Sequence, residues 1–208
     1  MTQPITLIVN GTTRIDDLSL SADGEGEYMD CSLSYVYGDD GADEIRGSEL
    51  VTNFDYLYGD GGADIMDGGD GDDEMYGGAN YDILSGDEGD DYIEGNAGTD
   101  ALYGNDGDDE MYGNSDDDTM GGGEGNDRMK GGDGDDWLVG EDGEDWLCGM
   151  ADVDSLWGGE DNDIVWGDGG DDYVNDGGGV TFPDTDHCEN DSPSIYCEFT
   201  DQTSCPPF

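Results

Sequence analysis

The chain has 208 residues, of which four are basic and 57 are acidic, and its formal net charge at pH 7 is -53. A field of this sign repels nucleic-acid phosphates and anionic lipid headgroups, so nucleic acid is excluded as a partner and cations are favoured. No apolar run approaches the roughly 18 residues of a membrane-spanning helix, which excludes membrane insertion. The 39 glycines and the low hydrophobicity are otherwise typical of disordered chains, because little apolar surface offsets the entropy of ordering.

The N-terminal segment, residues 1–37, is predicted to be a β cap that contains one degenerate repeat. Residues 11–19 keep a glycine together with Asp16 and Leu18, in the spacing that the rest of the chain repeats. Residues 1–10 have neither the basic start nor the long apolar run of a cleaved secretory signal. Because solenoids usually need capping segments, we expect caps at both ends.

A nine-residue repeat organises the middle of the chain. Residues 38–46 form one full copy, and residues 47–58 form another with three extra residues. From Gly59 to Asn175, thirteen units follow one another without an insertion. Position one is glycine and position six is aspartate in every unit, and position eight is always Met, Leu, Ile or Val. We therefore predict a repeat domain over residues 38–175.

Position four of the repeat is predicted to have a left-handed backbone. It is glycine in nine units and is otherwise only Asn80, Asp116, Asp152 or Asp161. Asn and Asp are the side chains that best tolerate a positive φ. The pattern therefore predicts a tight turn in every unit, followed by a strand that carries the apolar side chain of position eight.

These columns resemble the RTX nonapeptide GGxGxDxUx, a calcium-binding β-helix repeat. The resemblance covers residues 38–175, about two thirds of the chain. It implies an all-β fold, a right-handed parallel β-roll (a β-solenoid) with two nonapeptides per coil, so that unit n lies beside unit n+2. It also implies that the first six residues of a unit form a calcium-binding turn and the last three a short strand.

The carboxylates and glycine carbonyls of these turns are the candidate metal ligands. Ca²⁺ takes six to eight oxygens, and stacking repeats about 4.8 Å apart would bring position-six carboxylates together, where they repel one another unless a cation intervenes. The candidate carboxylates are Asp43, Asp64, Asp73, Asp82, Asp91, Asp100, Asp109, Asp118, Asp127, Asp136, Asp145, Asp154, Asp163 and Asp172. The candidate carbonyls are those of Gly59, Gly62, Gly68, Gly71, Gly77, Gly86, Gly89, Gly95, Gly98, Gly104, Gly107, Gly122, Gly125, Gly131, Gly134, Gly140, Gly143, Gly167 and Gly170. Pairing each of the thirteen units with its second neighbour gives eleven Ca²⁺ sites, and the flanking copies allow for more. Because the apolar side chains alone do not offset the entropy of ordering, we expect the chain to fold when calcium binds.

Other interpretations of an acidic, glycine-rich chain fit less well. An EF-hand needs a helix on each side of its loop, and this sequence has no helical periodicity. Collagen needs glycine at every third residue, which is not the case here. An ice-binding roll needs ranks of Thr and Asn in turns that here contain mainly Asp, Glu and Ala.

All four tryptophans lie at the outward-facing positions seven and nine of four successive units. Unit parity puts Trp137 and Trp157 on one sheet and Trp146 and Trp166 on the other. Three explanations stay open: an interface or sugar-stacking surface, the ordinary strand propensity of aromatic residues, or cover by the C-terminal tail. An acidic row at position five of the even units is interpreted as a solvated rim, with a mineral-binding or calcium-bridged contact as the alternative. It is formed by Asp72, Asp90, Asp108, Asn126, Glu144 and Asn162.

Residues 176–208 are predicted to form a Cys-containing C-terminal cap or tail. Asp186 and Cys188 keep the spacing of positions six and eight. Because Cys148 lies at position nine beside Trp146, a disulfide from it to a tail cysteine would pin the tail over the tryptophans. Cover would also involve Ile195, Tyr196 and Phe199.

The sequence favours a structural protein over an enzyme. Its one histidine, His187, lies in the degraded tail, and no segment outside the array is long enough for a catalytic domain. Three cysteines in the last 21 residues indicate an oxidising compartment, and weak calcium sites fill only where calcium is abundant. We therefore expect a secreted or cell-surface protein, although its tail departs from the C-terminal signal of type I secretion.

The leading hypothesis for its role is a calcium-binding structural subunit that self-assembles into filaments or a surface layer. Cys31 near one end and the tail cysteines near the other would allow intermolecular disulfides. The first alternative is an adhesin or carbohydrate-binding module that uses its Trp and Tyr faces, including Tyr76, Tyr103 and Tyr112. The second is a calcium-triggered folding segment of a secreted enzyme.

Overall fold

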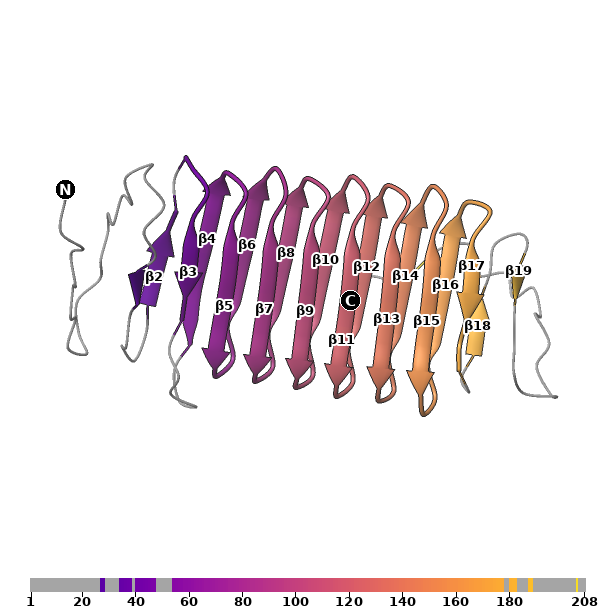
Figure 1. Ribbon diagram of the computed structural model, residues 1–208. Coiled ribbons are helices and arrows are strands. Elements are labelled where there is room, and N and C mark those ends of the chain that lie inside the picture. The colour runs from indigo at the N-terminus through magenta and orange to yellow at the C-terminus, as the bar shows by residue number, and fades with distance from the viewer. Residues whose placement is uncertain are drawn as a thin grey trace.

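The computed structural model describes residues 27–28, 34–38, 40–47, 54–177, 180–182, 187–188 and 205. These residues form a flattened solenoid of two parallel sheets, and the chain crosses from one sheet to the other at every turn (Figure 1). We call the sheets odd and even, after the numbers of their strands. Among the described residues, no helix is long and apolar enough to cross a membrane.

The odd sheet has ten strands, which are adjacent in the order of their numbers. They are β1 (Glu27–Tyr28), β3 (Glu44–Arg46), β5 (Ile65–Asp70), β7 (Ile83–Glu88), β9 (Ala101–Asp106), β11 (Thr119–Glu124), β13 (Trp137–Asp142), β15 (Ser155–Glu160), β17 (Tyr173–Asn175) and β19 (His187–Cys188). The even sheet has nine strands, likewise adjacent in the order of their numbers. They are β2 (Ser34–Tyr37), β4 (Asp55–Gly61), β6 (Glu74–Ala79), β8 (Tyr92–Ala97), β10 (Glu110–Ser115), β12 (Arg128–Asp133), β14 (Trp146–Ala151), β16 (Ile164–Gly169) and β18 (Val180–Phe182).

Each strand of the array pairs in parallel with the strand two further along the chain. Met111 of β10, for example, lies opposite Ile93 of β8 and Met129 of β12, which are 18 residues to either side. Two nonapeptides therefore complete one coil, and the predicted parallel β-solenoid is confirmed. The two rows of turns in Figure 1 follow from this arrangement, with the turns of odd units along one edge and those of even units along the other.

The strands are longer than the resemblance implied. A typical strand covers positions seven to nine of one unit and continues through positions one to three of the next, as in β8 (Tyr92–Ala97). The expectation of three-residue strands is wrong because positions two and three also pair with the neighbouring coil, as Asn114 does with Gly132. The register passes over position one, so the glycine there has no partner opposite it in the described strand pairs.

Position two is left-handed in all thirteen units, which the sequence analysis did not anticipate. Its φ ranges from 64° at Asp60 to 126° at Gly132, and it is positive even at Glu141 and Met150. The left-handed backbone predicted at position four is found at all four non-glycine residues, with φ of 84° at Asn80 and 73–76° at the other three. Seven position-four glycines also have a positive φ, but Gly62 and Gly170 do not, so the prediction is wrong at these two. In the other eleven units, left-handed residues at positions two and four alternate with ordinary ones, which reorients the peptide carbonyls of the turn.

The hydrophobic core is one row of position-eight side chains between the two sheets. These side chains are at most 3% exposed, and they are Val36, Ile45, Leu57, Met66, Met75, Leu84, Ile93, Leu102, Met111, Met120, Met129, Leu138, Leu147, Leu156, Val165 and Val174. The position-one glycines, which are also buried, flank this row. The core is thus one residue wide.

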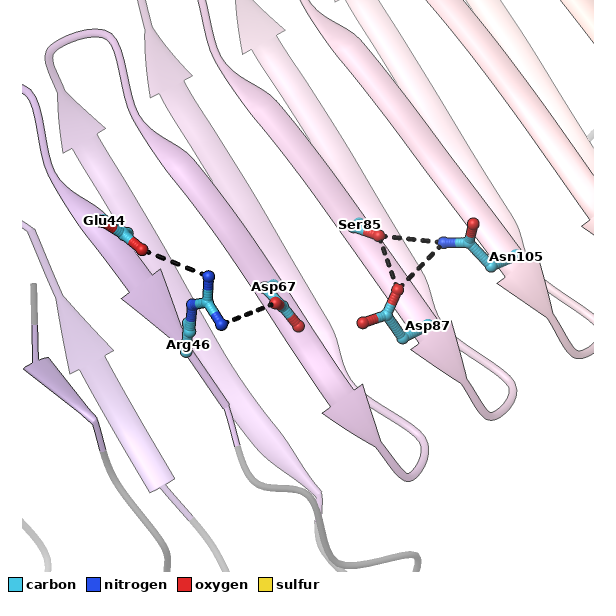
Figure 2. A network of polar contacts seen from close by, with 6 residues as sticks. All are labelled: Glu44, Arg46, Asp67, Ser85, Asp87 and Asn105. Atoms are coloured by element: carbon cyan, nitrogen blue, oxygen red, sulfur yellow. Dashed lines mark hydrogen bonds and ion pairs between the residues drawn. The ribbon is translucent and has the colours of Figure 1, made fainter.

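The outer faces carry the side chains of positions seven, nine and two. On the odd sheet, Arg46 lies 3.3 Å from Glu44 and 3.9 Å from Asp67 (Figure 2). Two coils further on, Ser85 Oγ donates to Asp87 Oδ1 at 2.9 Å, and Asn105 Nδ2 donates to Ser85 Oγ at 3.0 Å. The Arg46–Asp67 and Asn105–Ser85 contacts link neighbouring strands. All four contacts lie on the surface, where each contributes only about a few tenths of a kcal/mol.

Strands also extend the sheets into both predicted caps. β1 and β2 lie within residues 1–37, and β18 and β19 lie within residues 176–208. Cys188 pairs with Val174 and so takes the register of position eight, as its spacing predicted. The repeat predicted at residues 11–19, Asp186 and the tail residues Ile195, Tyr196 and Phe199 lie outside the described residues. The boundaries at residues 38 and 175 stay predictions.

Candidate metal centre

The position-six aspartates form a buried ladder along each edge of the solenoid. All thirteen are at most 3% exposed, and they stack coil upon coil. The backbone N–H of Asp82 donates to Oδ1 of Asp100 at 2.8 Å, and the N–H of Asp100 donates to Oδ1 of Asp118 at 2.7 Å. Bonds of 2.7–3.0 Å repeat this contact along the array, from Asp64 to Asp172. One carboxylate oxygen of each aspartate is therefore used by the fold.

The other oxygen, Oδ2, is buried and has no hydrogen-bond partner among the described residues at twelve of these positions. They are Asp64, Asp73, Asp82, Asp91, Asp100, Asp109, Asp118, Asp127, Asp136, Asp145, Asp154 and Asp163. A buried polar atom without a partner costs about 1–3 kcal/mol, and more when it is charged. Twelve regularly spaced instances are too many for a fold without a ligand, since native proteins contain only a few unsatisfied polar groups per hundred residues.

The position-one glycine leaves a space beside each of these oxygens. A Cβ placed on Gly77 would lie 2.7 Å from Oδ2 of Asp82 and 2.9 Å from the carbonyl oxygen of Gly95. The same point at Gly68 is 2.7 Å from Asp73 Oδ2 and 2.8 Å from the carbonyl oxygen of Gly86. We call this space a cradle. It brings together a carboxylate oxygen of one unit and the position-one carbonyl two units later, and any side chain at position one would fill it.

Eleven cradles of this kind lie within the array. Their glycines are Gly59, Gly68, Gly77, Gly86, Gly95, Gly104, Gly113, Gly122, Gly131, Gly140 and Gly149. Two more precede the array, where Gly38 lies beside Asp43 and Gly47 beside Asp55. The structure therefore brings the predicted position-six carboxylates and position-one carbonyls together.

The position-four glycines lie differently from those of position one. A Cβ on Gly107 would meet the carbonyl oxygen of Gly89, so position-four carbonyls point along the stack toward the next position-four residue. Their role as calcium ligands stays a prediction. A Cβ on Gly170 would also lie 2.6 Å from Oδ1 of Asp172.

Burial sets the charge state of the ladder. It raises the pKa of the position-six carboxyls from 3.8 to between about 6, at Asp100, and about 8, at Asp118. The backbone N–H bond to Oδ1 opposes this rise, and neighbouring carboxylates add to it. Near neutral pH the ladder is thus held close to the point at which it loses its protons, where a bound cation would favour the ionised form.

The donor set fits calcium. All the oxygens around a cradle are carboxylate or carbonyl oxygens, which suit hard cations and not zinc or copper. Within the described part of the chain, no three His, Cys, Asp or Glu side chains converge as they would in a metal cage built from side chains alone. A calcium ion held here would therefore take backbone carbonyls together with the carboxylates as ligands. When bound, a divalent ion would neutralise the carboxylates and link successive coils.

Asp55 belongs to the ladder but was missed in the sequence. It is fully buried, its N–H donates to Asp73 Oδ1 at 2.7 Å, and its own Oδ2 would lie 2.8 Å from a Cβ on Gly47. The three-residue insertion in residues 47–58 moves it out of the ninefold register. The signal that would have found it is the spacing of Asp55 and Leu57, which is the spacing of positions six and eight.

The acidic row at position five is an ordered ladder as well as a solvated rim. The N–H of Asp108 donates to Oδ1 of Asp90 at 2.9 Å, and that of Asn126 donates to Oδ1 of Asp108 at 2.7 Å. These residues are exposed, so their remaining oxygens face water. The row thus caps the outer amides of the turns.

The four tryptophans separate into two different pairs. On the odd sheet, the rings of Trp137 and Trp157 are 4.3 Å apart, and Tyr173 extends the stack at 5.3 Å. Trp137 is 50% exposed. On the even sheet, Trp146 and Trp166 are 5.7 Å apart, and Trp166 is only 4% exposed. Trp137, on the odd sheet, is therefore the one exposed tryptophan of the four.

A disulfide joins Cys148 to Cys205, as the position of Cys148 beside the even-sheet tryptophans suggested. The backbone N–H of Cys205 donates to Oδ2 of Asp168 at 2.9 Å. Cys148 is fully buried and lies opposite Trp166 in the register of β14 and β16. The C-terminal tail is therefore pinned to the even sheet at this point.

Comparison with known families agrees with this geometry. The family of the RTX calcium-binding nonapeptide repeat matches four stretches, residues 52–84, 85–120, 121–156 and 149–180. Together they cover residues 52–180, which is more than half of the chain. No curated protein matches the sequence. With its ninefold register, its stacked position-six carboxylates and this match, the chain belongs to the RTX calcium-binding nonapeptide repeat family.

Proposed function

We propose that this protein is a calcium-dependent structural element that works outside the cell and has no catalytic role. The observation that carries the proposal is the ladder of twelve buried Oδ2 atoms, eleven of which lie beside a cradle that also contains a backbone carbonyl oxygen. Eleven cradles in the array and two before it support a stoichiometry of eleven or more Ca²⁺ ions. The position-six aspartates and position-one carbonyls would hold the ions, and position-four carbonyls would complete the coordination.

Folding on calcium follows from the thin core. A single row of position-eight side chains is a small hydrophobic interior for so long a chain, and each coil also buries two carboxyl groups. Burying a charge without a counter-ion is unfavourable, whereas an ion that binds only the folded chain stabilises it by about 2.7 kcal/mol at a hundredfold excess over Kd. The contribution of one ion is modest, but many successive sites add up to a large driving force.

A calcium titration tests this proposal. Far-UV circular dichroism should show little strand signal in excess chelator at pH 8 and a cooperative gain as calcium is added. Native mass spectrometry on the same samples should count eleven or more bound ions. A full strand signal in chelator, or a folded chain that binds no calcium, would sink the proposal.

An extracellular location is supported by the disulfide as well as by the calcium sites. The Cys148–Cys205 bond requires an oxidising compartment to persist. Sites built from few carboxylates and many carbonyls are weak, and extracellular modules typically work at Kd values of about 10⁻⁴ to 10⁻³ M. The sites would stay empty in calcium-poor cytosol.

Self-assembly would use the outer face of the odd sheet. That face carries the exposed side chains of Ile65 (53%), Tyr103 (41%) and Trp137 (50%), and a second copy would remove them from water. Bound calcium would reduce the repulsion between copies. Light scattering with and without calcium tests this role, because a chain that stays monomeric at every concentration in calcium is not a filament or surface-layer subunit. Intermolecular disulfides through Cys31, which lies outside the described residues, stay a prediction.

The stack of Trp137, Trp157 and Tyr173 favours a second function, carbohydrate binding. Aromatic rings on a flat surface bind the apolar faces of sugar rings, and Ser155 and Asn175 on the same strands offer hydrogen-bonding groups. Binding of the calcium-loaded protein to insoluble cellulose and chitin tests it. Trp137→Ala and Trp157→Ala should abolish retention, whereas Tyr81→Ala, an exposed aromatic outside the stack, should leave it unchanged.

A further inference from the structure

The position-six ladder of the even units does not end at Asp163. Asp176 follows β17 directly, at the place where the next unit would have its position-one glycine. A Cβ on Gly177 would meet the carbonyl of Gly159, so Gly177 stacks on Gly159, and Asp176 therefore stacks on Gly158. Gly158 is the position-one glycine of the unit that contains Asp163, and a Cβ on it would lie 2.7 Å from Asp163 Cβ.

This last unit exchanges the positions of its glycine and its carboxylate. In every unit of the array, aspartate directly precedes the position-seven residue. Val180 takes position seven here because it pairs with Ile164, and the residue before it is Gly179. The carboxylate is instead at position one, where every unit of the array has glycine. The chain therefore places a buried carboxylate in the glycine column at the end of the ladder.

The side chain of Asp176 has no solvent exposure, and neither of its carboxylate oxygens has a hydrogen-bond partner among the described residues. Asp163 is likewise fully buried, and its Oδ2 has no hydrogen-bond partner among the described residues. Burial raises the pKa of Asp163 to about 6, and the charge of Asp176 adds to this rise. Two adjacent buried carboxylates repel each other strongly unless a cation lies between them.

We infer that Asp163 and Asp176 together form a separate calcium site at the C-terminal end of the ladder, with two carboxylates where a cradle of the array has one. This inference rests on the proposed function, because it assigns the same ion to a different set of ligands. The affinity of an oxygen site for calcium rises with the number of charged ligands. The end site therefore fills at a lower free calcium concentration than the cradles and empties after them.

Native mass spectrometry of the full chain during a calcium titration tests this site. Asp176→Asn removes one carboxylate, and Asp176→Gly restores the glycine that the array has at position one. Asp171→Asn is the matched control, because Asp171 is an exposed acid in the preceding turn and its loss changes the net charge equally. Both Asp176 variants should bind one ion fewer at saturation and lack the ion that the wild type keeps at the lowest free calcium. The control should match the wild type.

The outcomes separate this inference from the proposed function. If both Asp176 variants bind as many ions as the wild type, and at the same free calcium, the end site does not exist while the array sites stand. If Asp176→Asn does not fold in saturating calcium, the number of ions that Asp176→Gly binds decides whether the end site exists. A wild-type chain that binds no calcium overturns the proposed function itself.

Discussion

Filling one cradle with a methyl group should prevent one calcium from binding while leaving the backbone unstrained. Gly95 is suited to this test because its φ lies outside the left-handed region, so alanine is strained only by what its Cβ meets. That Cβ would lie 2.6 Å from Asp100 Oδ2 and 3.1 Å from the carbonyl oxygen of Gly113. The carboxylate cannot move away freely, since its Oδ1 is held by the N–H of Asp82 at 2.8 Å.

Gly121→Ala provides the control for this substitution. A Cβ on Gly121 meets nothing closer than Tyr103 Cδ1 at 3.6 Å and Glu141 Oε1 at 3.7 Å, which are ordinary contacts. Replacing glycine by alanine without strain stabilises a protein by about 0.4–1 kcal/mol through the unfolded chain, and this gain is common to both variants. The difference between the two variants therefore isolates the cradle.

The expected difference in the free energy of unfolding is about 4–6 kcal/mol in saturating calcium. Overpacking contributes about 1–3 kcal/mol, and the lost ion contributes about 2.7 kcal/mol at a hundredfold excess over Kd. Urea denaturation followed by circular dichroism measures the difference, and native mass spectrometry counts the ions. The reasoning is refuted if Gly95→Ala binds as much calcium as Gly121→Ala and unfolds at the same urea concentration.

Three further predictions concern pH, a single carboxylate and the disulfide. Burial raises the pKa of position-six carboxyls such as Asp73 from 3.8 to about 7. The calcium-free fold should therefore gain stability as pH falls from about 8 toward 4 and lose it as pH rises again. Circular dichroism in chelator should show more strand at pH 5 than at pH 8, and equal signals would contradict this. Asp118→Asn should bind one ion fewer and be destabilised by about 2.7 kcal/mol in saturating calcium. In chelator at pH 8 it should instead show more strand than the wild type, because its amide needs no counter-ion. A variant that is less ordered in both conditions would refute the charge argument. Reducing the Cys148–Cys205 bond, which spans 57 residues, should lower the free energy of unfolding in calcium by about 4 kcal/mol. The Cys148→Ser variant should not respond to reductant. Wild-type urea curves that coincide with and without reductant would exclude a stabilising role for the disulfide.

The sequence was sufficient to predict the features that repeat without exception. Position eight had to be the core because it is the one column that is always apolar, and Leu102 and Met111 are fully buried. The stacking of unit n on unit n+2 also followed, and with it the separation of Trp137 from Trp146 onto different sheets. The partner of Cys148 was predicted only as some tail cysteine, because nothing in the spacing distinguishes Cys205 from the others.

What escaped the sequence analysis were features that depend on backbone geometry or on a shifted register. Position two contains Gly, Asn or Asp in eleven units, but Glu141 and Met150 concealed its left-handed conformation, which neighbouring coils impose on them. Asp55 was hidden by a three-residue insertion, and Asp176 by its place in a glycine column. In each case the backbone of the adjacent coil, and not the local sequence, sets the position of the residue.

The ladders at positions five and six explain why neighbouring aspartates of one turn have different roles. In both ladders Oδ1 accepts a backbone N–H from an adjacent coil, at 2.9 Å for Asp90 and 2.8 Å for Asp109. The position-five side chain is exposed, so water satisfies its second oxygen, and the side chain acts only as a cap. From Asp64 to Asp163 the position-six side chain is buried beside a glycine, where no protein donor among the described residues satisfies Oδ2. Burial, and not residue type, therefore determines which of the two carboxylates requires a cation, and replacing the flanking glycine should block cation binding only at position six.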